Sequence, residues 1–384
     1  MNFYSLRPVG EPIICKQTSQ NPADCFKPCE ATFYNSGTAA LAAAIAAAID
    51  LHRQRHPQSQ ARAEIILPAY ACPALVSAIL FNNAKPVLVD LAPNHISLDL
   101  DALQQHLKAN TAAVISVDLF GLPSLSPQLR DLLRQHHCTL IHDCAQATPS
   151  TTRLAAVEDE LVVVSFGRGK PVSILSGGAV LCAPGQPYQL PAQAEQKPAQ
   201  WSAKLQTWLK FQAYNLIIKP RIYWLSRYLP IPLGETRYEP LAHIGAITAA
   251  ALPYLPINLA HVRSQPQMLR TKYAQLGKTL TNQGWIDLCE TADPQHQQTL
   301  LRYALLAPSQ HVRDNLLGKQ IGHTQGLTAL YEKTIPDIDN IPPALQQASQ
   351  FINAESFAVR LITLPVYADL KDIAISNSLI NNAC

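Results

Sequence analysis

Three groups of residues in this chain have types and spacing that could do chemistry. Ser36-Gly37-Thr38 precedes an alanine-rich run, where a helix start would offer backbone N–H groups and hydroxyls suited to a phosphate. Asp143 and Lys170 each follow an apolar run, and Ser165 closes the run before the lysine. Such an amine could bind an anion or form a Schiff base with a carbonyl compound. The helix start is equally typical of an ordinary capped helix.

The lysine stands in a glycine-flanked turn between two apolar runs, which together span residues 162–182. This pattern predicts a buried strand, a tight loop that holds one amine, and a second buried strand. A phosphate-binding P-loop is excluded, because that motif needs a glycine five residues before Gly-Lys and a Ser or Thr after it. Val164 and Pro171 occupy those two places.

Strands alternate with helices through residue 183, which predicts an α/β fold with a mainly parallel sheet covered by helices on both faces. Ligands on such sheets bind at the carboxyl ends of the strands, so Asp143 and Lys170 are expected in one crevice. The expected strands are 64–68, 85–91, 112–123 and 138–147, and the expected helices begin after Gly37 and at Pro73 and span 98–107 and 127–136.

The composition predicts a large core and two domains. Of the 384 residues, 48% are hydrophobic and 15% charged, against roughly 25% charged in an average protein. The net charge of +3 is too small to indicate nucleic-acid binding. The length exceeds one usual domain, and helical patterns with shorter strands at 299–307 and 359–365 follow residue 247. We expect a large α/β domain at 1–245 and a small α+β domain at 246–384.

Nine cysteines without a CxxC pair indicate reduced thiols and a cytoplasmic protein. Cys25 and Cys29 form a close pair, but no second ligand pair accompanies them, so we expect no metal site. The amino terminus shows no signal-peptide pattern, and no apolar run approaches the ~20 residues that span a bilayer.

A basic aromatic segment follows the linker-like residues 185–200. Residues 201–230 hold three of the four tryptophans, five Lys or Arg and no acidic residue, within an expected insertion at about 197–234. Apolar residues at 201, 205, 208, 211 and 214 approximate one helical stripe. Such a helix could lie on a membrane surface. Because Pro220 interrupts the stripe, packing against the core or a partner subunit is the favoured interpretation.

Together, the three groups match what pyridoxal 5′-phosphate (PLP) needs. The helix start and Ser165 could supply donors to its phosphate, and Asp143 could keep its ring nitrogen protonated. Lys170 could form the Schiff base with its aldehyde and, once released, carry a proton.

The chain resembles the DegT/DnrJ/EryC1/StrS family of sugar aminotransferases, which are PLP enzymes of fold type I that aminate nucleotide-linked keto-sugars. The spacing of Ser165-Phe166 to Lys170 and the Asp-x-Ala-Gln motif at 143–146 are its most specific marks. Further similar segments are NSGTAAL (35–41), ILPAYACPA (66–74), KPVLVDLAPNHISLD (85–99), SVDLFGLP (116–123), GGAVL (177–181) and AESFAVRLITLPVYADL (354–370).

The resemblance implies a role for each matching residue. Lys170 would form the Schiff base, Asp143 would pair with the pyridine nitrogen, and Gln146 would lie near the 3-hydroxyl of the ring. The phosphate would be held by Gly37, Thr38 and Ser165, beside Ser36. Glutamate or a similar donor would charge the cofactor, and a keto-sugar would then take the amine. The family also implies a homodimer. A subgroup of the family has histidine in place of this lysine and catalyses dehydration. Lys170 therefore argues against dehydration in this protein.

Some positions depart from the family pattern. Cys72 stands where an aromatic ring usually covers the cofactor, and Tyr70 is a candidate substitute. Residues 239–245 read EPLAHIG where the family has a segment that reaches the partner's phosphate. Arg168 is a candidate for additional anion binding. These departures leave two alternatives: a PLP-fold protein with little or no catalysis, and a PLP enzyme for a non-sugar or lipid-linked substrate.

Overall fold

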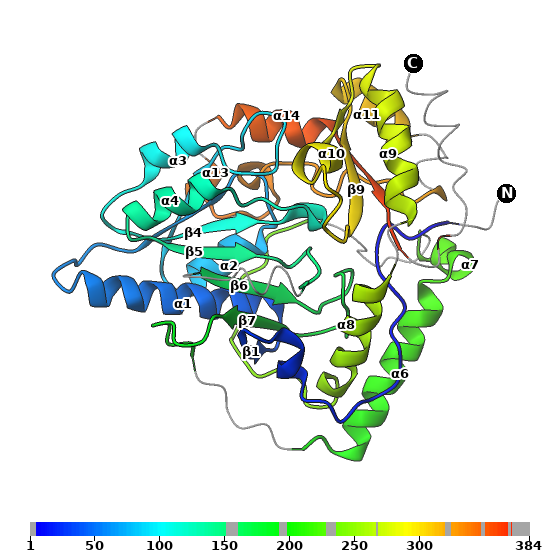
Figure 1. Cartoon of the computed structure of the whole chain (residues 1–384), viewed down its shortest axis with the longest axis horizontal. Helices are drawn as coiled ribbons and strands as arrows, with labels where there is room; N and C mark the ends of the chain where they lie inside the picture. Colours follow the sequence, from blue (N-terminus) through cyan, green and yellow to red (C-terminus); the bar gives the residue numbers. More distant parts are fainter. Residues whose placement is uncertain are drawn as a thin grey trace.

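The computed structural model describes residues 5–150, 160–191, 198–227, 236–265, 268–318, 324–346, 350–367 and 370. Its main sheet has seven strands in the order β1-β7-β6-β5-β4-β2-β3 (Figure 1). The strands are β1 (Glu30–Tyr34), β2 (Glu64–Pro68), β3 (Lys85–Val89), β4 (Thr111–Val117), β5 (Thr139–Asp143), β6 (Glu160–Ser165) and β7 (Gly178–Cys182).

Five neighbouring strands of this sheet, β3-β2-β4-β5-β6, are parallel, which confirms the expected α/β sheet. The edge differs from the expectation, because β7 runs antiparallel to β6 and β1 runs antiparallel to β7. Strand β1 is not among the strands expected from the sequence. Its five residues, EATFY, show little apolar alternation, and of their side chains only that of Tyr34 is buried.

Helices cover both faces of the sheet. Helices α1 (Gly37–Arg55) and α2 (Ala74–Phe81) share an apolar core with Ile65 and Leu67 of β2. Helices α3 (Leu100–His106) and α4 (Pro127–Gln135) pack on the opposite face. They share an apolar cluster with Ile66, the β2 residue between Ile65 and Leu67. This alternation follows from the two-residue period of a strand.

A smaller antiparallel sheet has the strand order β10-β9-β8. Its elements are β8 (Ile286–Asp287), β9 (Arg302–Leu306), β10 (Leu361–Pro365), α9 (Met268–Thr281), α10 (Leu288–Ala292), α11 (Gln310–Gly318) and α14 (Ile352–Arg360). Helix α8 (Leu255–Ser264), in contrast, packs in one apolar cluster with Val162, Val164 and Phe166 of the large sheet. We therefore propose that the domain boundary falls between α8 and α9, and not at residues 245 and 246.

The smaller unit sits at the carboxyl edge of the main sheet. Leu301 N donates to Phe120 O, just beyond β4, over 2.8 Å. Ile335 N donates to Ala69 O, just beyond β2, also over 2.8 Å. The amino-terminal segment also contacts the smaller sheet, because Arg302 Nη1 of β9 donates to Pro8 O. Residues far apart in sequence are thus brought to one edge.

The basic aromatic segment forms helix α6 (Trp201–Ile217), then the short helices α7 (Pro220–Tyr223) and η3 (Trp224–Arg227). Residues 192–197 and 228–235 of the expected insertion lie outside the described residues. The expected single stripe divides in two: positions 211 and 214 are buried, whereas positions 201, 205 and 208 are exposed. None of the helices in the described ranges is both long and apolar enough to cross a membrane.

Candidate active site

Lys170 lies in a closed loop between β6 and β7. The loop starts where Phe166 N donates to Gly177 O (2.9 Å), and Ile174 N donates back to Phe166 O (3.0 Å). Gly169 adopts a φ of +74°, a conformation that favours glycine. Of the glycines around the lysine, Gly169 at least is required by the turn. The loop therefore holds the lysine at the carboxyl end of β6.

The amino terminus of α1 abuts the end of β6. The Ser36 side chain caps the helix by accepting from Ala39 N over 3.0 Å. A Cβ on Gly37 would lie 2.6 Å from Ser165 Oγ, so only glycine lets the helix begin this close to the strand. The first N–H groups of a helix have no intrahelical partner. Those of Gly37 and Thr38 thus have no partner within the helix, and both residues lie near Ser165 in the cavity described below.

Asp143 ends strand β5 and is buried. Its Oδ1 accepts from Ala145 N over 2.8 Å, which fixes the carboxyl group. Burial raises the pKa of the Asp143 carboxyl above its ordinary value, and the N–H of Ala145 and the amine of Lys170 act in the opposite direction. A carboxylate in this setting gains from a cationic partner.

One cavity of about 400 Å³ collects these groups. Eight of the nine predicted site residues line it: Ser36, Gly37, Thr38, Cys72, Asp143, Gln146, Ser165 and Lys170. They come from four places in the sequence, and the sheet brings them to its carboxyl edge. The cavity thus has an amine and a carboxylate, with a helix terminus and its hydroxyls among its walls.

Tyr331 is a lining residue that the sequence did not reveal. Its hydroxyl accepts from Gln146 Nε2 over 3.1 Å, while Gln146 Oε1 accepts from Phe120 N over 2.9 Å. The glutamine amide is therefore held at both ends. Burial raises the pKa of the Tyr331 hydroxyl, as does the neighbouring Cys72, so the hydroxyl keeps its proton. Tyr331 lies in an irregular segment without a motif, and no local pattern indicates its role.

The ninth predicted residue, Tyr70, does not line this cavity, and its assignment as a ring over the cofactor is corrected. Its side chain is fully buried, and its hydroxyl donates to Tyr331 O over 3.0 Å. Its ring centroid lies 5.0 Å from that of Phe357. The chain bends directly after β2, so Tyr70 and Cys72 do not share the face that an extended strand would give them. Through this hydrogen bond Tyr70 holds the backbone of Tyr331, which does line the cavity.

The structure also locates the two other departures from the family pattern, Arg168 and the segment at 239–245. Arg168 is exposed and is not part of this cavity wall, so additional anion binding by Arg168 stays a prediction. The segment at 239–245 lies against the start of α1, where Asn35 N donates to Gly245 O over 2.8 Å. It borders a second hollow of about 390 Å³, whose wall includes Arg237 and shares Ser36, Thr38, Cys72 and Ala74 with the first cavity.

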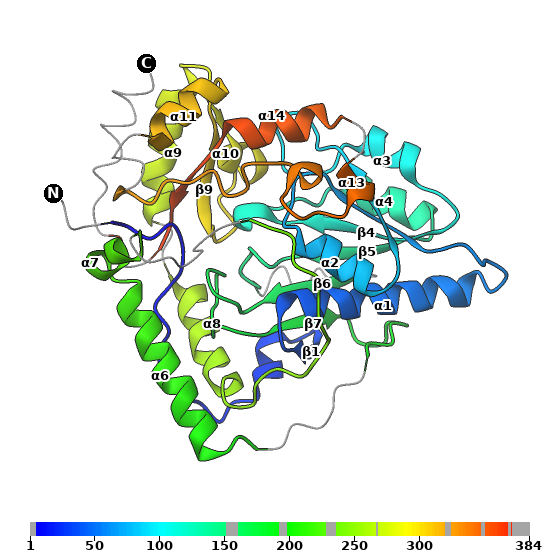
Figure 2. The same cartoon turned by 180° about the vertical axis from the view of Figure 1, so that it is seen from behind.

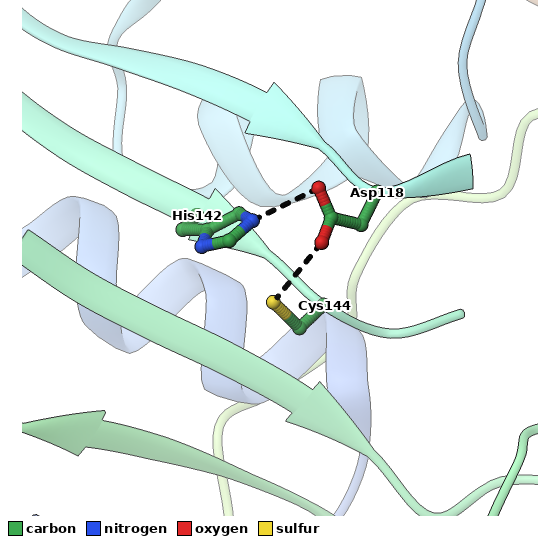
Figure 3. A group of neighbouring side chains, drawn as sticks. All are labelled: Asp118, His142 and Cys144. Carbon is green, nitrogen blue, oxygen red and sulfur yellow. Dashed lines mark hydrogen bonds and ion pairs between the residues drawn. The ribbon is translucent and has the colours of Figure 1, made fainter. Parts of the chain in front are cut away.

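Behind Asp143, the other face of the sheet carries a buried polar group of Asp118, His142 and Cys144 (Figure 3). His142 Nε2 lies 3.0 Å from Asp118 Oδ1, and Cys144 Sγ lies 3.9 Å from Asp118 Oδ2. Ser124 adds its N–H (2.9 Å) and its hydroxyl (2.7 Å) to Asp118 Oδ1. These atoms are close enough to hold a metal ion, and together with Ser124 they form a buried network in which Asp118 has several partners, whereas His142 Nδ1 makes no hydrogen bond to the described residues.

Burial lowers the pKa of His142, but the adjacent Asp118 and Cys144 outweigh burial, so its pKa is raised well above the ordinary value. The raised pKa favours the protonated form of His142, which can pair with the Asp118 carboxylate. Strand alternation directs His142 and Cys144 away from the cavity that Asp143 faces.

A model of the DegT/DnrJ/EryC1/StrS aminotransferase family matches residues 23–191. The UDP-N-acetyl-3-dehydro-alpha-D-glucosamine 3-aminotransferase of Acidithiobacillus ferrooxidans is 33% identical over 84 residues, 22% of this chain and 23% of that protein. The dTDP-4-amino-4,6-dideoxy-D-glucose transaminase of Shigella dysenteriae is 26% identical over 153 residues, 39% of each chain. The matches thus span well under two thirds of these relatives.

Solved structures share the fold along almost the whole chain. NtdA of Bacillus subtilis with bound cofactor PMP has a TM-score of 0.66 at 15% identity, covering 96% of this chain and 77% of that one. PseC of Helicobacter pylori, an aminotransferase of pseudaminic acid biosynthesis, has a TM-score of 0.63 at 18% identity, covering 96% and 92%. The architecture is fold type I of the PLP-dependent enzymes, as expected. The matching segment 23–191 holds every residue of the cavity wall except Tyr331, so the cavity lies in the part of the chain that is similar to the DegT/DnrJ/EryC1/StrS aminotransferase family.

Proposed function

We propose that this protein is a PLP-dependent aminotransferase that transfers an amino group from glutamate or a similar donor to a nucleotide-linked keto-sugar. The observation that carries the proposal is that Lys170 and Asp143 line one cavity with the amino terminus of α1. The names of the related proteins, a UDP-sugar and a dTDP-sugar aminotransferase, support the substrate class.

The residues present fit the cofactor. Gly37 keeps the helix start bare, because any Cβ there would collide with Ser165, and the N–H groups of Gly37 and Thr38 suit a phosphate dianion. The Asp143 carboxylate, whose burial calls for a cationic partner, suits a protonated ring nitrogen. The amine of Lys170 suits a covalent link to the aldehyde. When bound, PLP supplies an electron sink that withdraws electrons from the carbon atom bearing the amino group.

The chain's own residues then divide the remaining work. Lys170 Nζ, freed from its covalent link, takes a proton from the carbon atom of the donor and returns one to the acceptor. Asp143 keeps its position through the N–H of Ala145, and so holds the charge that the ring requires. Gln146, fixed by Phe120 N and the Tyr331 hydroxyl, presents its amide in a fixed orientation toward the cavity.

The hollow bordered by residues 237–242 is the candidate entrance for the acceptor. It shares Ser36 and Cys72 with the cavity, so a sugar could reach Lys170 while its nucleotide lies outside. Arg237 offers a cation there, although Glu239 pairs with it at 2.7 Å. The family resemblance also supports a homodimer and a cytoplasmic site of action, both as parts of this proposal.

The test is a half-reaction followed by absorption spectroscopy. Purified protein reconstituted with PLP should show the absorption band of a lysine-bound cofactor, and glutamate should shift it to that of the aminated form. Addition of a keto-sugar nucleotide should restore the first band. Protein that binds PLP without a response to any amino donor would favour a non-catalytic PLP-fold protein. Protein that completes the cycle only with non-sugar ketones would reject the sugar substrate.

A further inference from the structure

Helix α6 is fixed to the rest of the protein along one face. Phe211 and Tyr214 are buried there, and the Phe211 ring meets that of Tyr254 edge-on at 5.0 Å. The Asn215 side chain accepts from Ile13 N and donates to Ile13 O, each over 2.8 Å. The helix lies at the outer edge of the molecule in both views, beside α8 and the amino-terminal segment (Figures 1 and 2). Its orientation is therefore set by contacts on the inner face.

The outer face of α6 is apolar although it is exposed. Five side chains form this outer stripe: Trp201 (76% exposed), Leu205 (39%), Trp208 (41%), Leu209 (51%) and Leu216 (51%). At 3.6 residues per turn they lie within one sector of the helix, with Gln212 as the polar residue among them. A contiguous exposed apolar surface of this kind marks an interaction site. Because the inner face is already packed, the stripe cannot turn inward.

The charges around the stripe have one sign. Residues 198–227 contain five Lys or Arg and no Asp or Glu. Lys204 is exposed on one border between the inner and outer faces, and Lys210 is exposed on the other side of the helix, nearer the inner face. Exposed Lys219 and Arg221 follow the helix, and the exposed Leu225 extends the apolar surface beyond it. Long basic side chains beside an apolar stripe can reach the headgroups of a bilayer while the stripe enters it.

A second copy of the chain is a poorer match for this surface. Pairing two outer stripes about a two-fold axis would bring the lysines of both copies together, with no acidic residue in 198–227 to neutralise them. An anionic bilayer supplies both the missing negative charge and the apolar contact. Tryptophan is also a side chain that favours the headgroup region.

We propose that α6 docks the protein on an anionic lipid surface, with the outer stripe in the headgroup region, Lys204 beside the lipid phosphates and the other basic residues of 198–227 adding to the attraction. Catalysis would then take place next to the membrane. The inference does not depend on the proposed reaction, since none of the outer-stripe residues lines the cavity.

Vesicle flotation tests this directly. The full chain should float with vesicles of equal parts phosphatidylcholine and phosphatidylglycerol, and should remain behind with phosphatidylcholine alone. The double variant Trp201→Ser/Trp208→Ser removes apolar contact, and Lys204→Glu/Lys210→Glu reverses two charges. Since each basic residue near an anionic surface contributes about 1 kcal/mol, we expect the charge reversal to weaken binding at least about tenfold.

Matched controls come from elsewhere on the surface. Lys272→Glu/Lys278→Glu reverses two exposed charges on α9, and Ile352→Ser removes a side chain of α14 that is 71% exposed. Both should float like the natural sequence. Thermal melts followed by circular dichroism should show that all variants fold, since none of the changed α6 residues belongs to the buried core.

Three results would overturn the proposal. The first is that the natural sequence fails to float with anionic vesicles. The second is that both α6 variants float as well as the two controls. The third is that light scattering shows the tryptophan variant to be a smaller assembly than the natural sequence, while neither binds vesicles. The third result would assign the stripe to contact with a second copy of the chain.

Discussion

The two faces of strand β5 carry similar polar groups in different states of pairing. Asp143 faces the cavity, where the N–H of Ala145 fixes one oxygen and an amine lines the same wall. On the opposite face, Asp118 receives two hydrogen bonds from Ser124 and pairs with His142. His142 and Asp143, which are adjacent residues of β5, thus contribute to a buried network and to an open site.

The difference indicates how a buried carboxylate can be interpreted. A carboxylate whose oxygens are surrounded by donors stabilises the fold, and removing it leaves those donors unpaired. A buried carboxylate directed into a cavity costs stability until a ligand provides the counter-charge. Asp118 therefore matches the first description and Asp143 matches the second.

The largest effect is expected at the amine of the open face. Lys170→Ala removes both the covalent link and the proton carrier, so transamination should fall by about 10³-fold or more. The measurement is the rate of the glutamate half-reaction in stopped flow. Lys278→Ala, on the exposed surface of α9, is the matched control and should retain full activity. Near-normal turnover in the Lys170 variant would remove this residue from the mechanism.

Asp143→Asn should separate activity from stability. We expect the half-reaction to slow by about 10²-fold, because the ring loses its fixed counter-charge. The cofactor-free variant should be no less stable than the natural protein at neutral pH. Burial raises the pKa of Asp143, so its carboxylate form disfavours folding above its unfolded pKa. A marked drop in the melting temperature of the cofactor-free variant would contradict this interpretation.

Asp118→Asn should have the reverse signature. Breaking the buried pair with His142 should lower the free energy of unfolding by about 3 kcal/mol in urea denaturation. Turnover per folded molecule should change far less than in the Asp143 variant. Asp131→Asn breaks an exposed pair with Arg134 at 3.2 Å and should cost no more than about 0.5 kcal/mol. Equal losses in the two variants would mean that the buried network contributes nothing special.

The buried network should also affect the pH dependence of stability. The pKa of His142 is raised in the folded state, so its contribution is complete below its unfolded pKa near 6.5. As the pH rises above that value toward the folded pKa, stability should fall by at most about 1.4 kcal/mol per pH unit. The difference in unfolding free energy between the natural protein and His142→Gln should shrink over this window. A difference that stays constant with pH would show that His142 is neutral.

The smallest predicted effect concerns the support of the open face. Tyr331→Phe removes the hydroxyl that accepts from Gln146. Loss of one hydrogen bond should weaken PLP binding by about 1 kcal/mol, or about fivefold, in an equilibrium titration. Phe357→Leu, which touches Tyr70 outside the cavity, should leave the affinity closer to normal. A larger loss of PLP affinity in the Phe357 variant than in the Tyr331 variant would place the cofactor away from Tyr331.

Local patterns predicted the elements that position the cavity. Strand β2 has the expected bounds of residues 64–68, because its apolar run is bounded by proline, and α1 begins where Ser36 caps it. The order of Ser36, Asp143 and Lys170 was enough to predict one crevice, since parallel strands end at the same edge. Each of these features depends on residues close together in the chain.

The features that the sequence did not predict depend on distant contacts. Tyr331 reaches Gln146 across 185 positions, and nothing in its own neighbourhood marks it. Strand β1 is defined by its pairing with β7, about 150 positions later, and not by its weak apolar pattern. The apolar positions of α6 suggested one stripe because their spacing alone does not reveal which of them meet the core.

The most direct test of the central claim is to map the lysine that carries PLP. Reduction of the PLP-loaded protein with borohydride, followed by proteolysis and mass spectrometry, should place the pyridoxyl group on the peptide that contains Lys170. The label should disappear when glutamate is added before the reduction. A label on another lysine, or one unaffected by glutamate, would contradict the assignment of Lys170 as the amine of an aminotransferase.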